Sequence, residues 1–237
     1  MTPAVSVVIP VYNAARVLDA SVEKLARVLG PREGEYEILL RDDGSHDGSG
    51  RLLEKISRRY ENIRYSSNGT NKGLGFTLRA LFQEARGDIM IYCDIDLPFG
   101  EGVISRLLDE VKDCDIAVAS RYAGGYNRIP FLRRMASRLY YALCRMLFSI
   151  TVVDIGSASV ALTRRAVTSL DLKSRGFAVH AEMYVQASRK GFRIKEFPAA
   201  SKSVGLSSFS IARHGVGVIR ETMWLLWNQR SLRAVKE

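Results

Sequence analysis

Short apolar runs rich in β-branched residues alternate with stretches of helical periodicity through the first half of the chain. Each run has the length of a buried strand, and each intervening stretch has the length of a helix. Strands that are joined by helices form parallel sheets with helices on both faces, so the alternation predicts an α/β fold. The expected strands are 5–10, 36–40, 63–65 and 89–93, and the expected helices run from Asn13 to Gly30, from about Gly50 onward, and from 71–75 through Ala85.

The second half of the chain continues the pattern with longer helices. With 47% hydrophobic and 25% charged residues, the chain has the composition of a globular protein rather than a disordered one. It contains no internal repeat, so we expect one principal domain. The expected elements are helices at 101–111, 130–150, 181–189 and 216–227 and strands at 116–120, 160–162 and 193–197.

Polar clusters follow three of the expected strands. They are Pro10 to Asn13, Asp42 to Ser45 and Asp94 to Asp96. The carboxyl ends of parallel strands meet at one edge of a sheet, and ligands of such sheets bind there, so we expect the clusters to form one pocket. Asn13 is also placed to cap the helix that follows it.

Two of these acids, Asp94 and Asp96, are separated by one residue after the buried run that starts at Ile89. At a strand end, both carboxylates can turn toward one cation. Carboxylate oxygens are preferred ligands of Mg²⁺ and Mn²⁺, and these ions also bind substrate phosphates. Asp is common in loops after strands as well, so a purely structural role for the pair stays open at this point.

The charge balance favours an anionic partner. With 35 Lys and Arg residues against 25 Asp and Glu residues, the formal net charge is +10, which suits phosphates, acidic lipid head groups or nucleic acid. The sequence has no P-loop ending in Lys-Ser/Thr and no Gly-x-Gly-x-x-Gly after the first expected strand. Gly73-Leu74-Gly75 is too short and follows the wrong strand for a dinucleotide site. Kinase-like and dehydrogenase functions are therefore excluded.

The cysteines Cys93, Cys114 and Cys144 are isolated, and their spacing matches neither a metal site nor a disulfide framework. We expect reduced thiols in a cytosolic protein. The first residues lack the basic and apolar segments of a secretory signal, and no apolar run approaches the roughly 18 residues of a membrane span. Any contact with a membrane is therefore expected at its surface.

The expected helix at 130–150 has an apolar arc with an arginine stripe beside it. Such a helix either packs on the core with a solvated basic edge or lies on an anionic membrane. The last expected helix poses the same choice, because Trp224 and Trp227 lie close to a basic C-terminal tail. The arc holds Leu132, Met135, Leu139, Leu143 and Leu147, the stripe holds Arg134, Arg138 and Arg145, and the last helix presents Ile219, Met223, Leu226 and Trp227.

The chain contains, in this order, Val8-Ile9-Pro10-Val11-Tyr12-Asn13, Asp42 to Ser49, Asn71 to Gly75, Ala85 to Asp88, Asp94 to Asp96, and Ser120 to Tyr122. These segments resemble successive motifs of glycosyltransferase family 2, which has the GT-A fold, a Rossmann-like and mostly parallel sheet flanked by helices. Further along, Asp154 with Ser157, Glu182, and Glu196-Phe197-Pro198 are similar to the dolichyl-phosphate mannosyltransferase branch and its polyprenyl-phosphate relatives.

This resemblance implies a nucleotide-diphosphate sugar as donor, GDP-mannose or UDP-glucose, and dolichyl or polyprenyl phosphate as acceptor. It implies Mg²⁺ or Mn²⁺ bound by Asp94 and Asp96, which together with Arg121 are the expected catalytic residues. The acceptor phosphate is expected to contact Arg121, Arg133 and Ser137, since Arg offers a planar, bidentate donor to phosphate. The donor nucleotide is expected to contact Pro10, Tyr12, Asn13, Asp42, Asp43, Lys72, Gly73 and Lys202, with Asp43 on the base and Asp42 holding its own loop.

The chain departs from the branch at three places. Pro98 follows Asp96-Leu97 where the branch has Gln, so we expect the metal to use water or another residue in place of that side chain. Lys202 and Ser208 stand where the branch has Arg and Lys, and Ser157-Ala158-Ser159 stands where it has Ser-Gly-Phe. The motifs therefore leave the donor sugar open.

The leading hypothesis is inverting transfer of mannose or glucose to the lipid phosphate by a peripheral enzyme on the cytoplasmic face of a membrane, without nucleic acid as a partner. Whether a partner protein supplies a membrane anchor stays open. One alternative keeps the fold but uses a saccharide hydroxyl as acceptor, which needs a carboxylate base, either Glu182 or Asp154. The other is a non-catalytic basic module that binds membrane or nucleic acid.

The predicted organisation has two parts. We expect residues 1–212 to form the GT-A domain, with 130–150 as an amphipathic interface helix within it. Residues 213–237 are expected to form an amphipathic helix and a basic tail.

Overall fold

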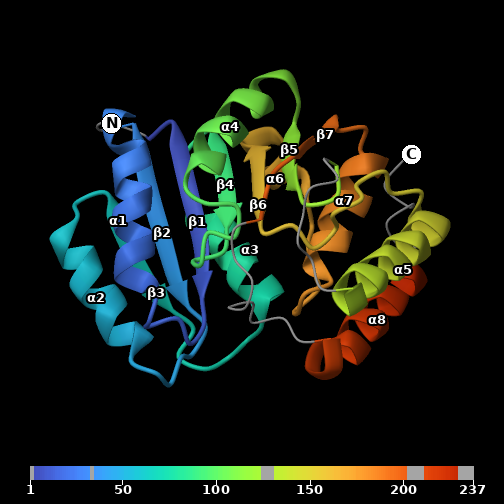
Figure 1. Cartoon of the computed structure of the whole chain (residues 1–237), viewed down its shortest axis with the longest axis horizontal. Coiled ribbons are helices and arrows are strands. Elements are labelled where there is room, and N and C mark those ends of the chain that lie inside the picture. The colour runs from blue at the N-terminus through green and yellow to red at the C-terminus, as the bar shows by residue number, and fades with distance from the viewer. Residues whose placement is uncertain (1–2, 33–34, 124–130, 202–210, 229–237) are drawn as a thin grey trace.

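A computed structural model describes residues 3–32, 35–123, 131–201 and 211–228. Within these residues, one seven-stranded sheet is covered by helices on both faces (Figure 1). Its strand order is β3-β2-β1-β4-β6-β5-β7, and β6 alone runs antiparallel to its neighbours, so the predicted mostly parallel sheet is confirmed. The strands are β1 (Val5–Val11), β2 (Tyr36–Asp42), β3 (Ile63–Ser67), β4 (Ile89–Cys93), β5 (Ile116–Ser120), β6 (Ser159–Thr163) and β7 (Ile194–Pro198).

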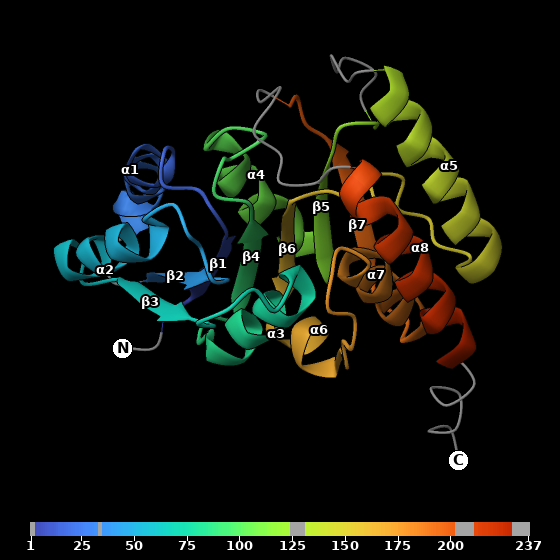
Figure 2. The same ribbon diagram turned by 90° about the horizontal axis from the view of Figure 1, so that it is seen from below.

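The helices form a layer on each side of the sheet (Figure 2). One face carries α1, α2 and α4, and the other carries α3, α6 and α7. The helices α5 and α8 lie side by side next to α7 and contribute Cys144, Phe148 and Leu225 to the same core cluster. The helices are α1 (Leu18–Leu29), α2 (Ser49–Arg59), α3 (Leu74–Glu84), α4 (Gly102–Glu110), α5 (Phe131–Phe148), α6 (Arg164–Ser169), α7 (Val179–Arg189) and α8 (Ile211–Asn228), with short 3₁₀ helices η1 (Gly30–Arg32) and η2 (Val111–Asp113).

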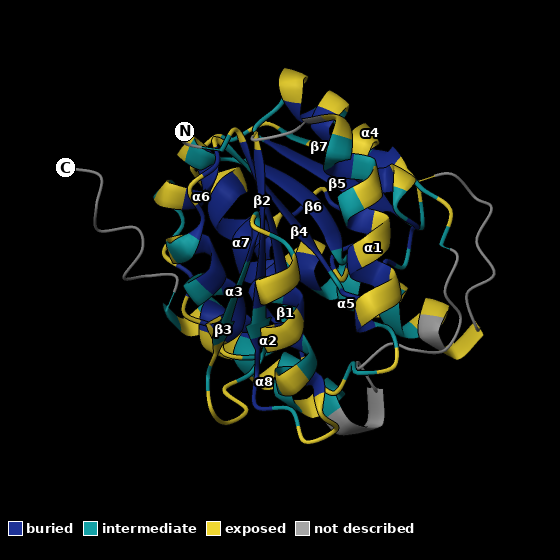
Figure 3. Ribbon diagram, turned by 90° about the vertical axis from the view of Figure 1, so that its left-hand side faces the viewer, coloured by how far each residue is buried: buried dark blue, intermediate teal, exposed yellow. Residues whose placement is uncertain are grey.

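The strand β1 shows why these apolar runs form the centre of the sheet. Val7 and Ile9 belong to the core cluster beneath α1, α2 and α4, whereas Val8 belongs to the cluster on the opposite face. Side chains of a strand alternate between faces, and a strand covered on both faces has a continuous apolar sequence. The sheet is accordingly buried, while the outer faces of the helices are exposed (Figure 3).

The structure extends some predicted elements and adds others. The helix α6 was not predicted, because six residues are too few to show a helical period; Thr163 caps it by accepting a hydrogen bond from the backbone N–H of Ala166 at 3.3 Å. The helix α8 begins at Ile211 rather than at the expected Val216. The division of the chain at 212/213 stays a prediction. All three cysteines are free thiols, as expected, and Cys93 and Cys144 are buried.

Candidate active site

The three polar clusters meet at the carboxyl edge of the sheet. In the parallel pairing of β1 with β2, Val11 lies opposite Asp42, and the backbone N–H of Asp43 donates to the carbonyl of Val11 at 2.8 Å. In the pairing of β1 with β4, Val8 lies opposite Tyr92, which places Asp94 level with Pro10. The predicted convergence is therefore confirmed.

Asn13 links two of the loops at this edge instead of capping a helix. Its backbone N–H donates to Ser45 Oγ at 2.8 Å, and its side-chain oxygen accepts from the N–H of His46 at 2.9 Å. Its φ is +50°, a left-handed conformation that Asn adopts more readily than most residues. The prediction that Asn13 caps the next helix is wrong, since α1 begins only at Leu18 and Asn13 turns toward the β2–α2 loop.

Asp47 and Ser49 add further bonds between the same two loops. Asp47 accepts from the N–H of Ala15 at 2.9 Å and from the hydroxyl of Ser49 at 2.6 Å, and Ser49 accepts from the N–H of Ala14 at 2.9 Å. Burial is the largest single effect on the pKa of Asp47 and raises it, but the hydrogen bonds together outweigh burial, and the net pKa is lowered. The exposed Tyr12 and Asn13 thus lie on a loop that hydrogen bonds from the β2–α2 loop hold in place.

The two buried aspartates of the second cluster organise loops. Asp42 accepts from the N–H of Ser45 at 3.1 Å, so it holds its own turn, and its contact with the donor stays a prediction. Asp43 accepts from the N–H groups of Lys72 and Gly73, at 2.8 and 3.0 Å, and from the Asn68 amide at 2.7 Å. Asp43 therefore anchors the loop that carries two other expected donor contacts, and its contact with the base stays a prediction.

Asp94 and Asp96 follow β4 in a tight turn. The N–H of Leu97 donates to the carbonyl of Asp94 at 3.0 Å, and the N–H of Gly100 donates to the carbonyl of Leu97 at 2.7 Å. Leu97 has a φ of +46°, although it is bulky and precedes a proline. Leu97 is only 6% exposed, so its packing holds a strained backbone directly beside the acids, a feature that often marks functional sites.

The donor atoms at this turn suit a divalent cation. Asp94 and Asp96 are both partly exposed and supply carboxylate oxygens, the ligands that Mg²⁺ and Mn²⁺ prefer. Among the described residues, no group of three or more His, Cys, Asp or Glu side chains is arranged to hold a metal ion. A metal held here would therefore complete its coordination with water and substrate phosphate, as Mg²⁺ usually does.

Two buried residues support Asp94 from behind. Tyr92 donates its hydroxyl to Asp94 Oδ1 at 2.9 Å, and His180 at the start of α7 places Nε2 3.2 Å from the same hydroxyl. Burial and the neighbouring Asp94 raise the pKa of Tyr92, whereas burial lowers the pKa of His180 to about 4, so both groups are neutral at pH 7. Sequence reasoning treated Tyr92 as part of an apolar run and missed His180, although a buried Tyr hydroxyl usually has a partner.

Arg121 follows β5 and is paired with Asp154. Its Nε and Nη2 donate to the two carboxylate oxygens at 2.8 and 2.6 Å, and its backbone N–H donates to Asp154 at 2.8 Å. Burial lowers the pKa of Arg121, but the hydrogen bond and charge of Asp154, with a further contribution from Asp94, raise it overall. Glu196 accepts from the N–H of Asp154 at 2.8 Å and completes the support. The cation is therefore held close to the acidic pair.

Glu182 is a structural residue. It is 1% exposed and accepts from the N–H groups of Lys173 and Ser174, both at 2.8 Å. Its carboxylate thus shapes the loop before α7. Next to this loop, Gly75 at the start of α3 donates its N–H to the carbonyl of Arg175 at 2.7 Å.

The structure describes some of the remaining predicted site residues and not others. Pro10 and Gly73 are half-buried and Lys72 is exposed at the edge described above. Ser137 is half-buried in α5, and Arg133 lies in the same helix with its side chain outside what the structure describes. Lys202 lies outside the described residues.

A surface of exposed apolar side chains covers α5 and α8, and we call it the α5–α8 surface. The two helices are tied by a hydrogen bond of 2.9 Å between the hydroxyls of Tyr140 and Thr222. The surface consists of Phe131, Leu132, Met135, Leu139 and Met146 from α5 and Val216, Ile219, Met223, Trp224 and Trp227 from α8.

The α5–α8 surface includes part of the predicted apolar arc. Leu132 and Leu139 are 74% and 75% exposed, so this part of the arc does not pack on the core. The core contacts of α5 come from Cys144 and Phe148, and Leu147 at the end of the arc packs, partly buried, against the same cluster. In the described part of the chain, no helix is long and apolar enough to span a membrane.

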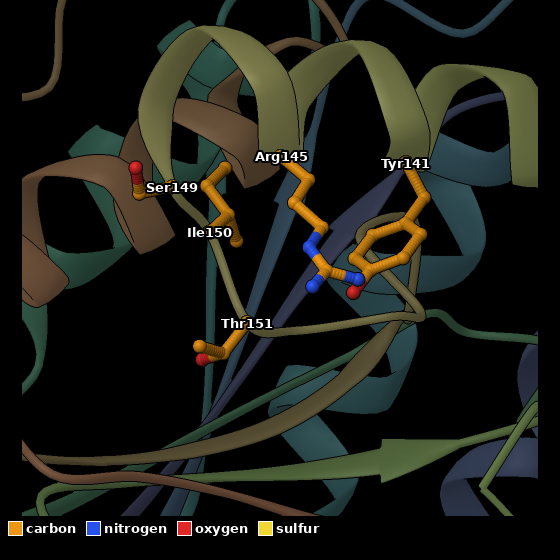
Figure 4. A pocket seen from close by; sticks show the side chains of 5 residues that line it. All are labelled: Tyr141, Arg145, Ser149, Ile150 and Thr151. Atoms are coloured by element: carbon orange, nitrogen blue, oxygen red, sulfur yellow. The ribbon is translucent and has the colours of Figure 1, made fainter.

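A shallow hollow lies at the end of α5 (Figure 4). Figure 4 shows Arg145 extending toward Tyr141, with Ile150 and Thr151 below the helix. Its lining is Tyr141, Arg145, Ser149, Ile150 and Thr151, and none of them is a predicted site residue.

Residues 6–170 match the model of the family described as glycosyl transferase family 2, and the chain belongs to this family. The fold agrees. The chain superimposes on glucosyl-3-phosphoglycerate synthase from Mycobacterium tuberculosis in complex with UDP, with a TM-score of 0.72, 18% identity and coverage of 94% of this chain and 79% of that one. Mannosyl-3-phosphoglycerate synthase from Rubrobacter xylanophilus gives a TM-score of 0.70 at 17% identity, covering 99% and 77%. The predicted GT-A fold is confirmed.

Curated relatives refine the comparison. The chain is 29% identical over 94% of its length to the glycosyltransferase AglD of Haloferax volcanii, and over 89% to dolichol-phosphate mannosyltransferase of Pyrococcus furiosus. It spans only 37% and 62% of these two proteins. It is 26% identical to undecaprenyl-phosphate mannosyltransferase of Micrococcus luteus, with 92% of each chain covered. Membership in a family of transferases favours an enzyme over the non-catalytic basic module.

Proposed function

We propose that this chain transfers a sugar, mannose or glucose, from a nucleotide-diphosphate sugar to a polyprenyl or dolichyl phosphate, with inversion at the anomeric carbon. The observation that carries the proposal is the meeting of Asp94 and Asp96 with the strongly held cation of Arg121 at one sheet edge. Such a site has one part for the donor diphosphate and another for an anionic acceptor. The names of the Pyrococcus and Micrococcus relatives support this acceptor class.

On the donor side, Asp94 and Asp96 would hold Mg²⁺ or Mn²⁺. A divalent ion bound there would neutralise the negative charge that develops on the departing diphosphate. In support, a structural neighbour, the M. tuberculosis synthase, was crystallised with Mn²⁺ and UDP. Beside this pair, the exposed Tyr12, Asn13 and Lys72 face the nucleotide, on loops that Asp43 and Asp47 keep in place.

On the acceptor side, a lipid monophosphate is already an anionic nucleophile at neutral pH. Its oxygen attacks the anomeric carbon as the bond from that carbon to the diphosphate oxygen breaks, and the nucleoside diphosphate leaves. Arg121 offsets the repulsion between the two anions and holds the acceptor in line, with Arg133 and Ser137 as further contacts. Asp154 binds Nε and Nη2 of Arg121 and so fixes the orientation of the guanidinium.

The alternative with a hydroxyl acceptor finds no support in the two candidate bases. Asp154 is 1% exposed and ion-paired with Arg121, and Glu182 is 1% exposed and bound to backbone N–H groups. A general base must reach the proton that it abstracts and must accept it readily. Both carboxylates are buried and engaged by other groups of the protein, so neither is placed to reach a substrate hydroxyl.

The α5–α8 surface is the proposed contact with the cytoplasmic face of a membrane, where the lipid acceptor resides. Exposed apolar patches of this kind mark interaction sites. Three exposed arginines of α5, Arg134, Arg138 and Arg145, flank the apolar arc and suit anionic head groups. The enzyme would therefore be a peripheral one.

A donor and acceptor screen tests the proposed function. Purified protein with Mn²⁺ or Mg²⁺ is expected to form a glycosylated lipid phosphate from GDP-mannose or UDP-glucose, and Asp96→Asn is expected to lower the rate by at least about 100-fold, of the order seen when one electrostatic group is removed. The product is identified by mass spectrometry of the intact lipid. Lys55→Ala, on the exposed side of α2, serves as the control. A rate that depends on a saccharide acceptor but not on lipid phosphate contradicts the proposal.

A further inference from the structure

A hydrogen-bonded chain runs from the acidic turn into the core. Tyr92 is 1% exposed and belongs to β4, two residues before Asp94. Its side chain lies in the core cluster on the α3–α7 face, and its hydroxyl reaches Asp94 Oδ1 at 2.9 Å. A buried phenol that is bonded to one carboxylate oxygen restricts how the carboxylate can rotate.

His180 holds the other side of the Tyr92 hydroxyl. It is 5% exposed, its Nε2 lies 3.2 Å from Tyr92 Oη, and its Nδ1 lies 3.1 Å from the carbonyl of Phe177. The two rings are stacked, with centroids 5.5 Å apart and an angle of 28° between their planes. His180 comes from the start of α7, so the contact joins two elements on one side of the sheet.

The hydrogen bonds fix the direction of this chain. The carbonyl of Phe177 can only accept, so we assign a proton to Nδ1 of His180, which leaves Nε2 of the neutral ring as an acceptor. The single hydroxyl hydrogen of Tyr92 then lies between two acceptors, Asp94 Oδ1 and His180 Nε2. The carboxylate is charged and closer, so it takes the hydrogen.

We propose that Tyr92 and His180 are positioning residues that set the orientation of Asp94 for a divalent cation. This inference rests on the proposed function. Tyr92 acts on Asp94 directly, and His180 acts through Tyr92. The Asp94 carboxylate has about four lone-pair positions, so it can accept from Tyr92 and bind a cation at the same time. His180 keeps the Tyr92 hydroxyl in place through the stacked rings and the contact of its Nε2.

The first test removes only the hydroxyl of Tyr92. Tyr92→Phe keeps the ring and its stacking, and we expect its affinity for Mn²⁺ in the presence of the nucleoside diphosphate to fall about 10-fold, as is usual when a supporting partner of a metal ligand is lost. Mn²⁺ binding is measured by electron paramagnetic resonance, and folding by the thermal unfolding midpoint. Activity of Tyr92→Phe should recover at saturating Mn²⁺.

Tyr184→Phe is the matched control. Its hydroxyl is also buried, and within the described part of the chain it makes no hydrogen bond. The substitution is chemically the same and lies in the same core cluster. We expect unchanged Mn²⁺ affinity, and an equal loss in both variants would overturn the inference.

The second test uses His180. His180→Asn keeps a donor for Phe177 but is too short to reach Tyr92, whereas the longer amide of His180→Gln reaches the position of Nε2. We expect His180→Asn to weaken Mn²⁺ binding and His180→Gln to restore most of it. In the Tyr92→Phe background, His180→Asn should have little further effect, because its action passes through the hydroxyl.

The outcomes separate this inference from the function on which it rests. If the wild-type protein binds no Mn²⁺ with GDP or UDP, the proposed function fails. If the wild type binds Mn²⁺ and Tyr92→Phe binds it equally well, only the positioning role fails. If the two losses add in the double variant, His180 does not act through Tyr92, and its part of the inference is overturned.

Discussion

At the scale of single residues, the site depends on charges that are buried and paired. Arg121 is 15% exposed and Asp154 is 1% exposed, and two hydrogen bonds join the two side chains. Such a pair adds little net stability compared with apolar side chains, but removal of one partner leaves a charge buried alone. The pair therefore fixes where a cation stands at the edge of the sheet.

We predict that Asp154→Asn destabilises the protein by about 3–5 kcal/mol, because Arg121 loses its counterion while it stays buried. Urea denaturation measures the free energy of unfolding. Asp109→Asn removes one partner of the exposed Lys112–Asp109 pair and is expected to cost under about 1 kcal/mol. Equal effects in the two variants would contradict the assigned role of burial.

His180 predicts a specific dependence of stability on pH. Burial lowers its pKa to about 4 in the folded state, while Phe177, Arg121 and Asp154 make smaller contributions of both signs. Its ordinary pKa is about 6.5, so between these values the unfolded chain binds a proton that the folded protein does not. Stability from His180 is complete above about pH 6.5 and is lost as the pH falls toward 4.

We predict that acidification from pH 7 to pH 5 removes about 2 kcal/mol of stability through His180. Other groups also titrate, so the measurement compares unfolding free energies of the wild type and of His180→Gln across this range. The difference between the two proteins isolates the imidazole. Parallel curves would show that His180 is not buried as a neutral group.

At the scale of elements, close backbone contacts set where α3 begins. A Cβ on Gly75 would lie 2.2 Å from the carbonyl oxygen of Ser174, and one on Gly73 would lie 2.5 Å from that of Arg175. Glu182 holds the same 173–175 loop from its other side. The start of α3, the donor loop anchored on Asp43 and the loop before α7 thus form one unit.

We predict that Gly75→Ala destabilises the protein by about 1–3 kcal/mol, since the backbone of Ser174 must move to admit the new methyl group. Gly102→Ala at the start of α4 is the control, because nothing lies within 4 Å of its added Cβ. The control should leave the free energy of unfolding unchanged or raise it by under about 1 kcal/mol. Urea denaturation distinguishes the two.

At the scale of the whole molecule, a net charge of +10 and the α5–α8 surface act together. Long-range attraction draws a cationic protein to anionic lipid, and apolar side chains then enter the interface.

We predict that Leu139→Glu weakens binding to anionic vesicles at least several-fold while thermal unfolding is unchanged, because Leu139 is 75% exposed. Lys55→Ala lowers the net charge of the protein by the same one unit, but it lies on α2, outside the α5–α8 surface, and should bind vesicles like the wild type. Vesicle co-sedimentation at two salt concentrations measures both effects.

The order of strands and helices was predictable because it follows from local patterns. Runs such as 5–10 and 89–93 have the composition of buried strands. The polar residues that follow each strand therefore meet at the carboxyl edge of a parallel sheet. The helix α6 was not predictable from periodicity, and Asn13 was misassigned because a cap and a link between loops use the same side chain. The roles expected for Lys202 and Arg133 stay predictions.

The α/β fold, the acidic pair and the excess of positive charge could be read from the amino-acid sequence, because they depend on composition, periodicity and spacing along the chain. The folded structure was needed to show that Leu132 and Leu139 of the apolar arc face outward, that Asp154 and Glu182 are bound to Arg121 and to backbone N–H groups, and that His180 reaches Tyr92 behind Asp94. The physical reason is that burial and hydrogen bonding join residues from distant elements. Local spacing carries no information about which of many polar residues will become partners in the folded chain.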